Sequence, residues 1–236
     1  MSKPRHTGDE DRPSSQADEE KTARVNDPER TRANIIEVAT GIFAAKGLSG
    51  ARIDEIADLT HTSKRMIYYY FESKEGLYTA VLEEAYRRIR TIESSLELDA
   101  LPPLEAIDRL VRFTFDYENA NPEFIRLVMV ENIHGAEHLA SLPGIGGLNS
   151  PAIESLRRIC ERGEAAGVIR PGLDLVHLHM SISAVSFFNV SNRHTMSTIF
   201  NHDMTSPAVL EARKDSVADM IVRYVASDRA LAAMKS

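Results

Sequence analysis

Apolar residues recur at intervals of three and four along most of the chain, a spacing that places them on one face of an α-helix. The first such segment follows Asp27, which can cap a helix, and Pro28, which suits a first helical position, and Gly47 can end it. Its apolar face comprises Ile35, Ile36, Ala39, Ile42 and Phe43. No segment shows the alternation and turn residues of a β-hairpin, so the pattern predicts an all-α protein.

Two short helices are predicted next, one within residues 51–60 and one from Ser63, its cap, to about Tyr69. The inward positions of the first are Ile53, Ile56, Ala57 and Leu59. Those of the second are Met66, Ile67 and Tyr70. Two short helices joined by a turn of three or four residues, after a longer support helix, indicate a helix-turn-helix.

The pattern changes near residues 95–101, after which the predicted helices are longer. A helix capped by Ser73 precedes this break. The later segments with helical spacing are 103–117, 122–134, 151–168, 173–190 and 207–228. The sequence therefore predicts about nine or ten helices, with a three-helix helix-turn-helix domain over 27–90 and a second helical domain over 91–236.

Residues 1–26 are charged and polar and nearly free of apolar side chains, so we expect a disordered tail there. The whole chain of 236 residues has a formal net charge of −7, so any basic surface must be local. Cys160 is the only cysteine, which fits a reducing compartment. The N-terminus has no apolar signal segment, and no apolar run is long enough to span a bilayer. We therefore expect a cytoplasmic protein with no membrane partner.

The second short helix carries four polar or aromatic side chains on its outer face. They are Lys64, Arg65, Tyr68 and Tyr69. Lysine and arginine at the start of such a helix can read base edges, and tyrosine hydroxyls and helix N-termini suit phosphate oxygens. Spacing alone leaves two interpretations equally open: a DNA-reading helix, or two packed helices with a solvated face.

Residues 30–83 decide between them, because they contain FAAKG, IDEIA, SKRMIYYYF and SKEGLY in this order. This run resembles the N-terminal DNA-binding domain of the TetR family of bacterial repressors. The resemblance implies that Phe71 and Tyr78 belong to the core. The residues that it implies at the DNA are Arg52, Thr62, Ser63, Lys64, Arg65, Tyr68, Tyr69, Tyr70 and Lys74.

Four positions depart from the family pattern. His61 stands where glycine is usual, so a left-handed backbone there would be strained. Thr62 replaces a frequent valine, and Tyr70 stands where many members have histidine. Arg65 replaces a small residue and can add a guanine contact. These changes affect the operator sequence that we expect rather than DNA binding itself.

The resemblance also implies a C-terminal ligand-binding domain and a homodimer on a palindromic operator in double-stranded DNA. The segments near 151–168 and 173–190 are apolar enough to bury more than one side, which favours a dimer interface there. The competing interpretation is one buried core helix and one ordinary amphipathic helix. A palindromic operator, which needs two recognition helices, favours the dimer.

Residues 124–139, 149–159 and 177–200 resemble a subgroup of repressors of catabolic operons, including nicotinate catabolism, which implies a small aromatic or carboxylate effector. Polar and aromatic groups within otherwise apolar helices are candidates to orient it. They are Arg126, Asn132, His134, His177, Phe187, Phe188, Asn192 and Arg193. For each one, a structural role is the competing interpretation.

A metal sensor and an enzyme on an all-α scaffold are the alternatives. His134 and His138 lie four residues apart, but Gly135 weakens a helix between them. His177 and His179 are two apart and point to different sides of a helix. No nucleophile elbow, phosphate-binding loop or dinucleotide fingerprint is present. We therefore expect no metal site, no cofactor and no catalytic residue.

Overall fold

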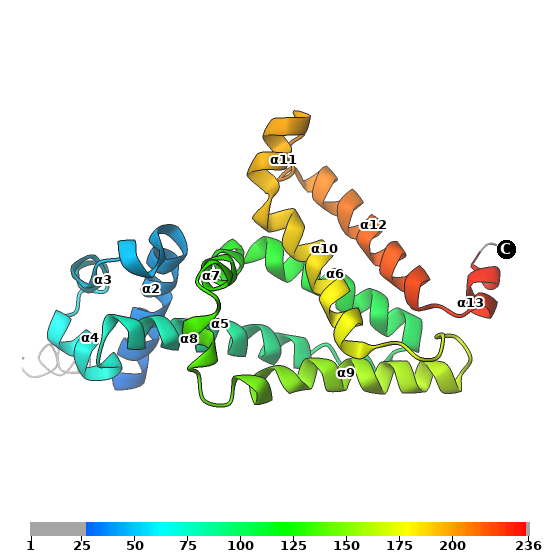
Figure 1. Ribbon diagram of the computed structural model, residues 1–236, viewed down its shortest axis with the longest axis horizontal. Helices are drawn as coiled ribbons and strands as arrows, with labels where there is room; N and C mark the ends of the chain where they lie inside the picture. The colour runs from blue at the N-terminus through cyan, green and yellow to red at the C-terminus, as the bar shows by residue number, and fades with distance from the viewer. Residues whose placement is uncertain (1–26, 235–236) are drawn as a thin grey trace, which may run out of the picture.

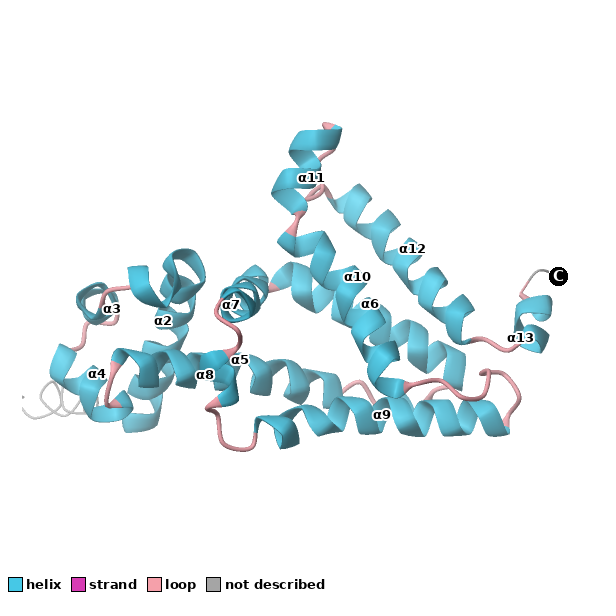
Figure 2. Cartoon of the chain, viewed as in Figure 1, coloured by secondary structure: helices cyan, strands magenta, loops and turns pink. Residues whose placement is uncertain are grey.

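The computed structural model describes residues 27–234, which form helices joined by short loops (Figure 1, Figure 2). Within this range the all-α prediction is confirmed, and the only strand-like pairing is an isolated bridge between Ile169 and Ala226. The predicted tail, residues 1–26, lies outside the described residues. None of the described helices is long and apolar enough to cross a membrane.

Twelve α-helices occupy the described range, more than the nine or ten expected, because short helices form where the sequence reads as connecting loop. The N-terminal helices are α2 (Pro28–Gly50), α3 (Ile53–Leu59), α4 (Lys64–Phe71) and α5 (Lys74–Ser94). A 3₁₀ turn, η1 (Leu98–Ala100), follows. The later helices are α6 (Pro103–Ala120), α7 (Pro122–Ile133), α8 (Glu137–Ala140), α9 (Ile145–Ala165), α10 (Leu175–Ser191), α11 (Arg193–Phe200), α12 (Pro207–Val225) and α13 (Asp228–Ala233).

Helices α2 to α5 form the predicted helix-turn-helix at one end of the molecule (Figure 1). The carboxylate of Asp27 caps α2 by accepting from the backbone of the first turn. Gly47 breaks the regular path of α2 with a φ of +67°, which glycine adopts without steric cost. The rings of Phe43 and Tyr78 meet edge to face, with centroids 5.0 Å apart, in the centre of this domain.

Two of the positions predicted to face inward are exposed. The Leu59 side chain is 57% exposed and that of Met66 37%. Leu59 is the last residue of α3, where the chain already turns away, and in α4 the neighbouring Ile67 occupies the inner position instead. Helices of seven and eight residues have few positions that face the support helices. A small error in assigning the buried face therefore predicts burial for a side chain that is exposed.

Helix α5 connects the two halves of the molecule, and it continues to Ser94, past the predicted boundary at residue 90. The core of the N-terminal half also includes Leu127 of α7 and Leu142, from beyond that boundary. The two halves therefore share α5 and also meet through α7 and the segment that follows it.

The C-terminal half has its own core, formed where α6, α9, α10 and α12 pack together (Figure 1). Its fully buried side chains include Ile107, Val111, Leu156, Ile159 and Val217. Both α9 and α10 contribute buried residues to it, so part of their apolar surface is used inside the chain.

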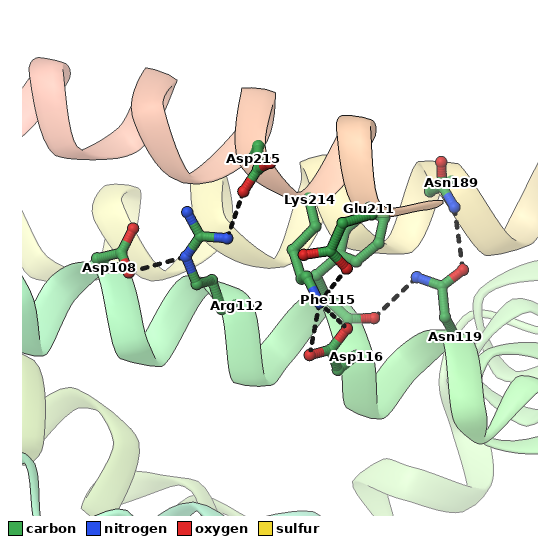
Figure 3. Close-up of polar contacts among 9 residues, drawn as sticks. All are labelled: Asp108, Arg112, Phe115, Asp116, Asn119, Asn189, Glu211, Lys214 and Asp215. Atoms are coloured by element: carbon green, nitrogen blue, oxygen red, sulfur yellow. Dashed lines mark hydrogen bonds and ion pairs between the residues drawn. The ribbon is translucent and has the colours of Figure 1, made fainter. Parts of the chain in front are cut away.

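Charged pairs hold α12 against α6 (Figure 3). The guanidinium of Arg112 on α6 bridges Asp108, at 2.8 Å, and Asp215 of α12, at 2.6 Å. In return, Lys214 of α12 reaches the carboxylate of Asp116 at 3.1 Å. Exposed pairs contribute little stability each, about 0.2–1 kcal/mol, so their main effect here is to fix how α12 lies along α6.

Candidate nucleic-acid interface and internal cavity

Helix α4 is positioned by its cap and by two apolar anchors. The Ser63 hydroxyl accepts a hydrogen bond from the Met66 N–H at 3.2 Å. Ile67 is fully buried and Phe71 almost so. The side chains of Lys64, Arg65, Tyr68 and Tyr69 are left exposed on the outer face, as the sequence predicts. The N-terminal turn of α4 thus presents two cations and free backbone N–H groups together, an arrangement that suits phosphates and base edges.

The turn before α4 has the left-handed backbone expected at the usual glycine position. His61 has a φ of +52° and lies exposed. A left-handed conformation costs a residue other than glycine roughly 1–2 kcal/mol. The turn is held nonetheless by the Thr60 hydroxyl, which donates to the Ile56 carbonyl at 2.7 Å, and by the Thr62 N–H, which donates to the Ala57 carbonyl at 3.0 Å. Thr62 itself is half-buried.

Tyr70 and Lys74 each make a contact within the protein beside their expected contacts with phosphate. Tyr70 is half-buried against the core, and its ring meets that of Tyr69 edge to face with centroids 5.3 Å apart. The ammonium of Lys74 donates to the Ala51 carbonyl at 3.3 Å, at the junction that precedes α3. This contact places the Lys74 ammonium at the residue that precedes Arg52.

An acidic residue that the sequence-based set missed lies within this cationic face. Asp54 of α3 forms an ion pair with Lys64, and its other oxygen lies 3.8 Å from the guanidinium of Arg52. The only sequence signal was an acid in the first turn of a helix, which the helix dipole alone explains. Asp54 therefore orders two of the expected DNA-contacting cations while it offsets part of their charge.

Replacing Asp54 by asparagine is expected to raise affinity for random-sequence DNA by about threefold to tenfold, because it frees Lys64 and removes a charge that repels phosphates. Fluorescence anisotropy at low salt measures this affinity. The matched control is Glu55→Gln, which also removes one negative charge from α3. The carboxylate of Glu55 pairs with Lys46 of α2, at 2.7 Å, and not with a cation expected at the DNA. Equal effects of the two substitutions would show that only net charge matters.

A second candidate site is a partly open cavity of about 290 Å³ lined by residues of α5, α6, α7 and α10. Its apolar and aromatic lining consists of Ile89, Leu110, Phe124, Val128, Ile182 and Phe187. Its polar lining consists of Tyr86, Arg90, Glu93, Thr114, Glu118, His179 and Ser183. Apolar and aromatic side chains beside converging polar groups suit a small-molecule site, although this wall has more polar residues than most such sites.

The ionisable groups on this wall have shifted pKa values. Glu118 is 4% exposed, and burial raises its pKa to about 8 against the opposing charge of Arg90. Burial also raises the pKa of Glu93, although the ion pair with Arg90 acts in the opposite direction. Burial lowers the pKa of His179, and Arg90 lowers it further. Such shifts cluster at functional sites, because function often needs charged groups held away from water.

A larger and more open hollow of about 870 Å³ lies beside the cavity, between the end of α5, η1 and the start of α9. Arg90 and Glu93 line both spaces. Their ion pair therefore stands between the outer hollow and the inner cavity.

Of the eight residues predicted to bind an effector, Phe187 alone lines the cavity. Arg126, Asn132, His134 and His177 are exposed, and Phe188 is 47% exposed. Asn192 and Arg193 are half-buried, and the Arg193 guanidinium donates to Asn119 at 3.4 Å. The effector roles of these residues stay predictions.

Sequence reasoning missed the polar wall of the cavity, and Glu118 above all. The signal that was available is helical spacing, since Leu110, Thr114 and Glu118 recur every four residues on a face that is otherwise apolar. Among residues 27–234, no group of three or more histidine, cysteine, aspartate or glutamate side chains is placed to hold a metal ion.

Exposed large apolar side chains of the C-terminal half lie mainly on α10, α11 and α12, with Ile199 and Phe200 on α11. The uncovered apolar surface of α10 and α12 consists of Val176, Met180 and Phe188 on α10, and Met220 and Tyr224 on α12. The segment 151–168 has no exposed large apolar side chain, and the dimer interface expected there stays a prediction. The apolar side chains of α9 lie within the chain's own core, and its outward positions are charged, as at Glu154, Arg157 and Arg158.

Comparison with known proteins gives a family match in each half of the chain. The family described as bacterial regulatory proteins, tetR family, matches residues 35–81, and the tetracyclin repressor-like C-terminal domain family matches residues 103–221. The HTH-type transcriptional repressor NicS of Pseudomonas putida is 35% identical over 200 residues, which cover 85% of this chain and 94% of NicS.

Two further proteins show how far the similarity extends. The HTH-type transcriptional regulator RutR of Escherichia coli is 33% identical over 102 residues, or 43% of this chain and 48% of RutR. A TetR transcriptional regulator from Chloroflexus aurantiacus has a similar fold, with a TM-score of 0.64 at 20% identity over 84% of this chain and 98% of that chain.

Proposed function

The chain belongs to the TetR family and is a DNA-binding transcriptional regulator, and we propose that it is a homodimeric repressor released from its operator by a small molecule. The observation that carries the proposal is the outer face of α4. There Lys64, Arg65, Tyr68 and Tyr69 are exposed together, while Ile67 and Phe71 fix the helix to the core. Each subunit would place this face in the major groove of one half-site.

The uncovered apolar surface of α10 and α12 is the proposed dimer interface. Exposed methionine and aromatic side chains on adjacent helices favour burial against a copy of themselves, because a twofold axis makes one patch complementary to itself. A palindromic operator then needs two recognition helices about 34–36 Å apart, one helical turn of DNA. This proposal keeps α10 from the sequence-based interface and replaces α9 by α12.

Helix α7 supports coupling between the cavity and the DNA-binding half. Phe124 and Val128 line the cavity, whereas Leu127 of the same helix belongs to the core of the N-terminal half. Further along α7, Glu131 accepts from the Leu139 N–H at 3.0 Å and lies beside His138, whose ring contacts that of Tyr78.

An effector that fits the cavity in only one arrangement of α7 would therefore shift the equilibrium between two positions of the recognition helices. The shift is limited by the difference between its affinities for the two states.

A gel-shift titration with DNA from upstream of the protein's own gene tests the DNA-reading face. Arg65→Ala is expected to lower affinity for the specific site by about tenfold to a hundredfold, with little effect on random DNA. Lys74→Ala is expected to weaken both kinds of DNA similarly and to reduce the salt slope by about 1. Arg157→Ala, which removes an exposed cation from α9, is the matched control and leaves both affinities unchanged. Unchanged binding by both test variants would refute the assignment of α4.

A further inference from the structure

The cavity wall holds one ionisable group that the fold buries without a complete set of partners. Glu118 is 4% exposed, and its Oε2 atom has no hydrogen-bond partner in the described part of the chain. A buried acceptor left unpaired costs about 1–3 kcal/mol. Because Glu118 lines the cavity, a ligand there can supply the missing donor.

The other charges on the wall already balance one another. The Arg90 guanidinium is paired with Glu93, and the side chains of both are at most 13% exposed. Burial and the charge of Arg90 lower the pKa of His179, which favours its neutral form. Glu118 and Glu93 therefore share one guanidinium, that of Arg90, as their counter-charge. An anionic ligand would meet two carboxyl groups and a guanidinium that is already paired, so the charge of the wall favours a cation.

The shape and lining of the cavity select for a small ring. A volume of about 290 Å³ lies at the lower end of the range for small-molecule sites. The rings of Tyr86 and Phe124 meet edge to face, with centroids 5.4 Å apart, and Phe187 adds a third ring to the lining. Aromatic faces attract both flat apolar rings and cations.

We propose that the effector is a small aromatic cation, a molecule with one ring and a protonated amine or amidine that donates to the Glu118 carboxylate. The ring packs against Phe124 and Phe187, and the nitrogen pairs with the unpartnered oxygen. This inference rests on the proposed function, and it narrows the small aromatic or carboxylate effector expected from sequence to the aromatic class with a positive charge.

Binding of such a cation changes the protonation of the site. Burial raises the pKa of Glu118 to about 8, so at pH 7 its carboxyl is mostly protonated and must release that proton to pair with a cation. The charged and titratable groups that share the cavity wall are Tyr86, Arg90 and Glu93 of α5 and His179 of α10, while the lining residues of α7 carry no charge. The cation is therefore expected to bind more tightly as the pH rises from 6 to 8.

Calorimetric titration of the protein without DNA tests the proposal. The cationic probes are benzylamine, phenethylamine and benzamidine, and their neutral and anionic counterparts are benzyl alcohol and benzoate. At least one cation is expected to bind about tenfold to a hundredfold more tightly than benzyl alcohol, the usual gain from a hydrogen bond to a charged group. Benzoate is expected to bind more weakly than benzyl alcohol.

Glu118→Gln should remove the preference for the cation, whereas Glu105→Gln, an exposed acid in the first turn of the same helix, should retain it. Three results would overturn the inference: no binding of any cation, preferential binding of benzoate, or an unchanged preference in Glu118→Gln. A parallel measurement of DNA binding without probe distinguishes failure of this inference from failure of the proposed function. Intact DNA binding with no cation preference defeats this inference alone, while absence of DNA binding defeats the proposed function.

Discussion

Replacing Glu118 by glutamine is expected to stabilise the protein by about 3 kcal/mol at pH 7. Burial raises the pKa of this carboxyl from 4.5 to about 8 in the folded protein. Between these values the folded protein keeps a proton that the unfolded chain has released, so the free energy of unfolding falls as the pH rises. Glutamine removes this penalty because it is neutral at every pH and has nearly the same shape.

The signature of this effect is its pH dependence. Urea denaturation of the wild type and of Glu118→Gln should give similar free energies of unfolding near pH 4.5 and an increasing difference up to about pH 8. Glu105→Gln, exposed on the same helix, should follow the wild type at every pH. A constant difference between Glu118→Gln and the wild type would mean that Glu118 does not titrate as its burial requires. Glu118 thus destabilises the fold at neutral pH, a cost that is common where a residue serves ligand binding.

The second large effect is expected from glutamates placed on the proposed dimer interface. The double variant Met180→Glu and Met220→Glu puts four charges into one twofold interface, two from each subunit. Burying unpaired charges costs several kcal/mol, so the variant should be a monomer that binds the operator at least about a hundredfold more weakly. Both wild-type side chains are exposed in the single chain, so the fold itself should be retained.

Light scattering after size exclusion measures the mass of this variant, and anisotropy measures its DNA affinity. The matched control is Ile133→Glu, which replaces a 76% exposed apolar side chain at the C-terminal end of α7, outside the proposed interface. The control should remain a dimer with wild-type affinity. If the double variant stays a dimer and the control does not, the interface lies on another face.

The DNA-binding half could be predicted well because its signals are local. Asp27, Ser63 and Ser73 are caps in the sequence and caps in the structure, where each side chain accepts from a backbone N–H of the first turn. The burial of Phe71 and Tyr78 and the strained backbone at His61 also follow from position within a short motif. Leu59 and Met66 were misplaced because a helix of two turns carries too few residues to fix its face.

The cavity was harder to predict because its wall depends on how four helices pack. Helix α10 is apolar on most sides, so its sequence does not show which positions face the chain's own core. His177 was chosen there, yet it is exposed, and His179 lines the cavity instead. In α6, Glu118 belongs to the apolar face by spacing, but only the packing of α5, α7 and α10 against that face makes it the wall of a cavity.

The dimer interface is also hard to predict from sequence, because a buried face can lie against the same chain or against a partner. An apolar stripe indicates that one side of a helix is buried. The stripe of α9, which includes Leu156 and Ile159, is buried in the core of the same chain. The stripe of α12 is shorter and interrupted by charge, so its exposed Met220 and Tyr224 stand out only after folding. Periodicity identifies buried faces, but not the molecule that buries them.

Selection of binding sites from random-sequence duplex DNA tests the central claim most directly, because it requires no knowledge of the target gene. The wild-type protein is expected to enrich a sequence with dyad symmetry whose half-sites are centred about 10 base pairs, or a multiple of that, apart. Arg65→Ala is expected to enrich a motif that is degenerate at one position of each half-site. Enrichment of no motif, or of one without dyad symmetry, would contradict a dimer that reads DNA through α4.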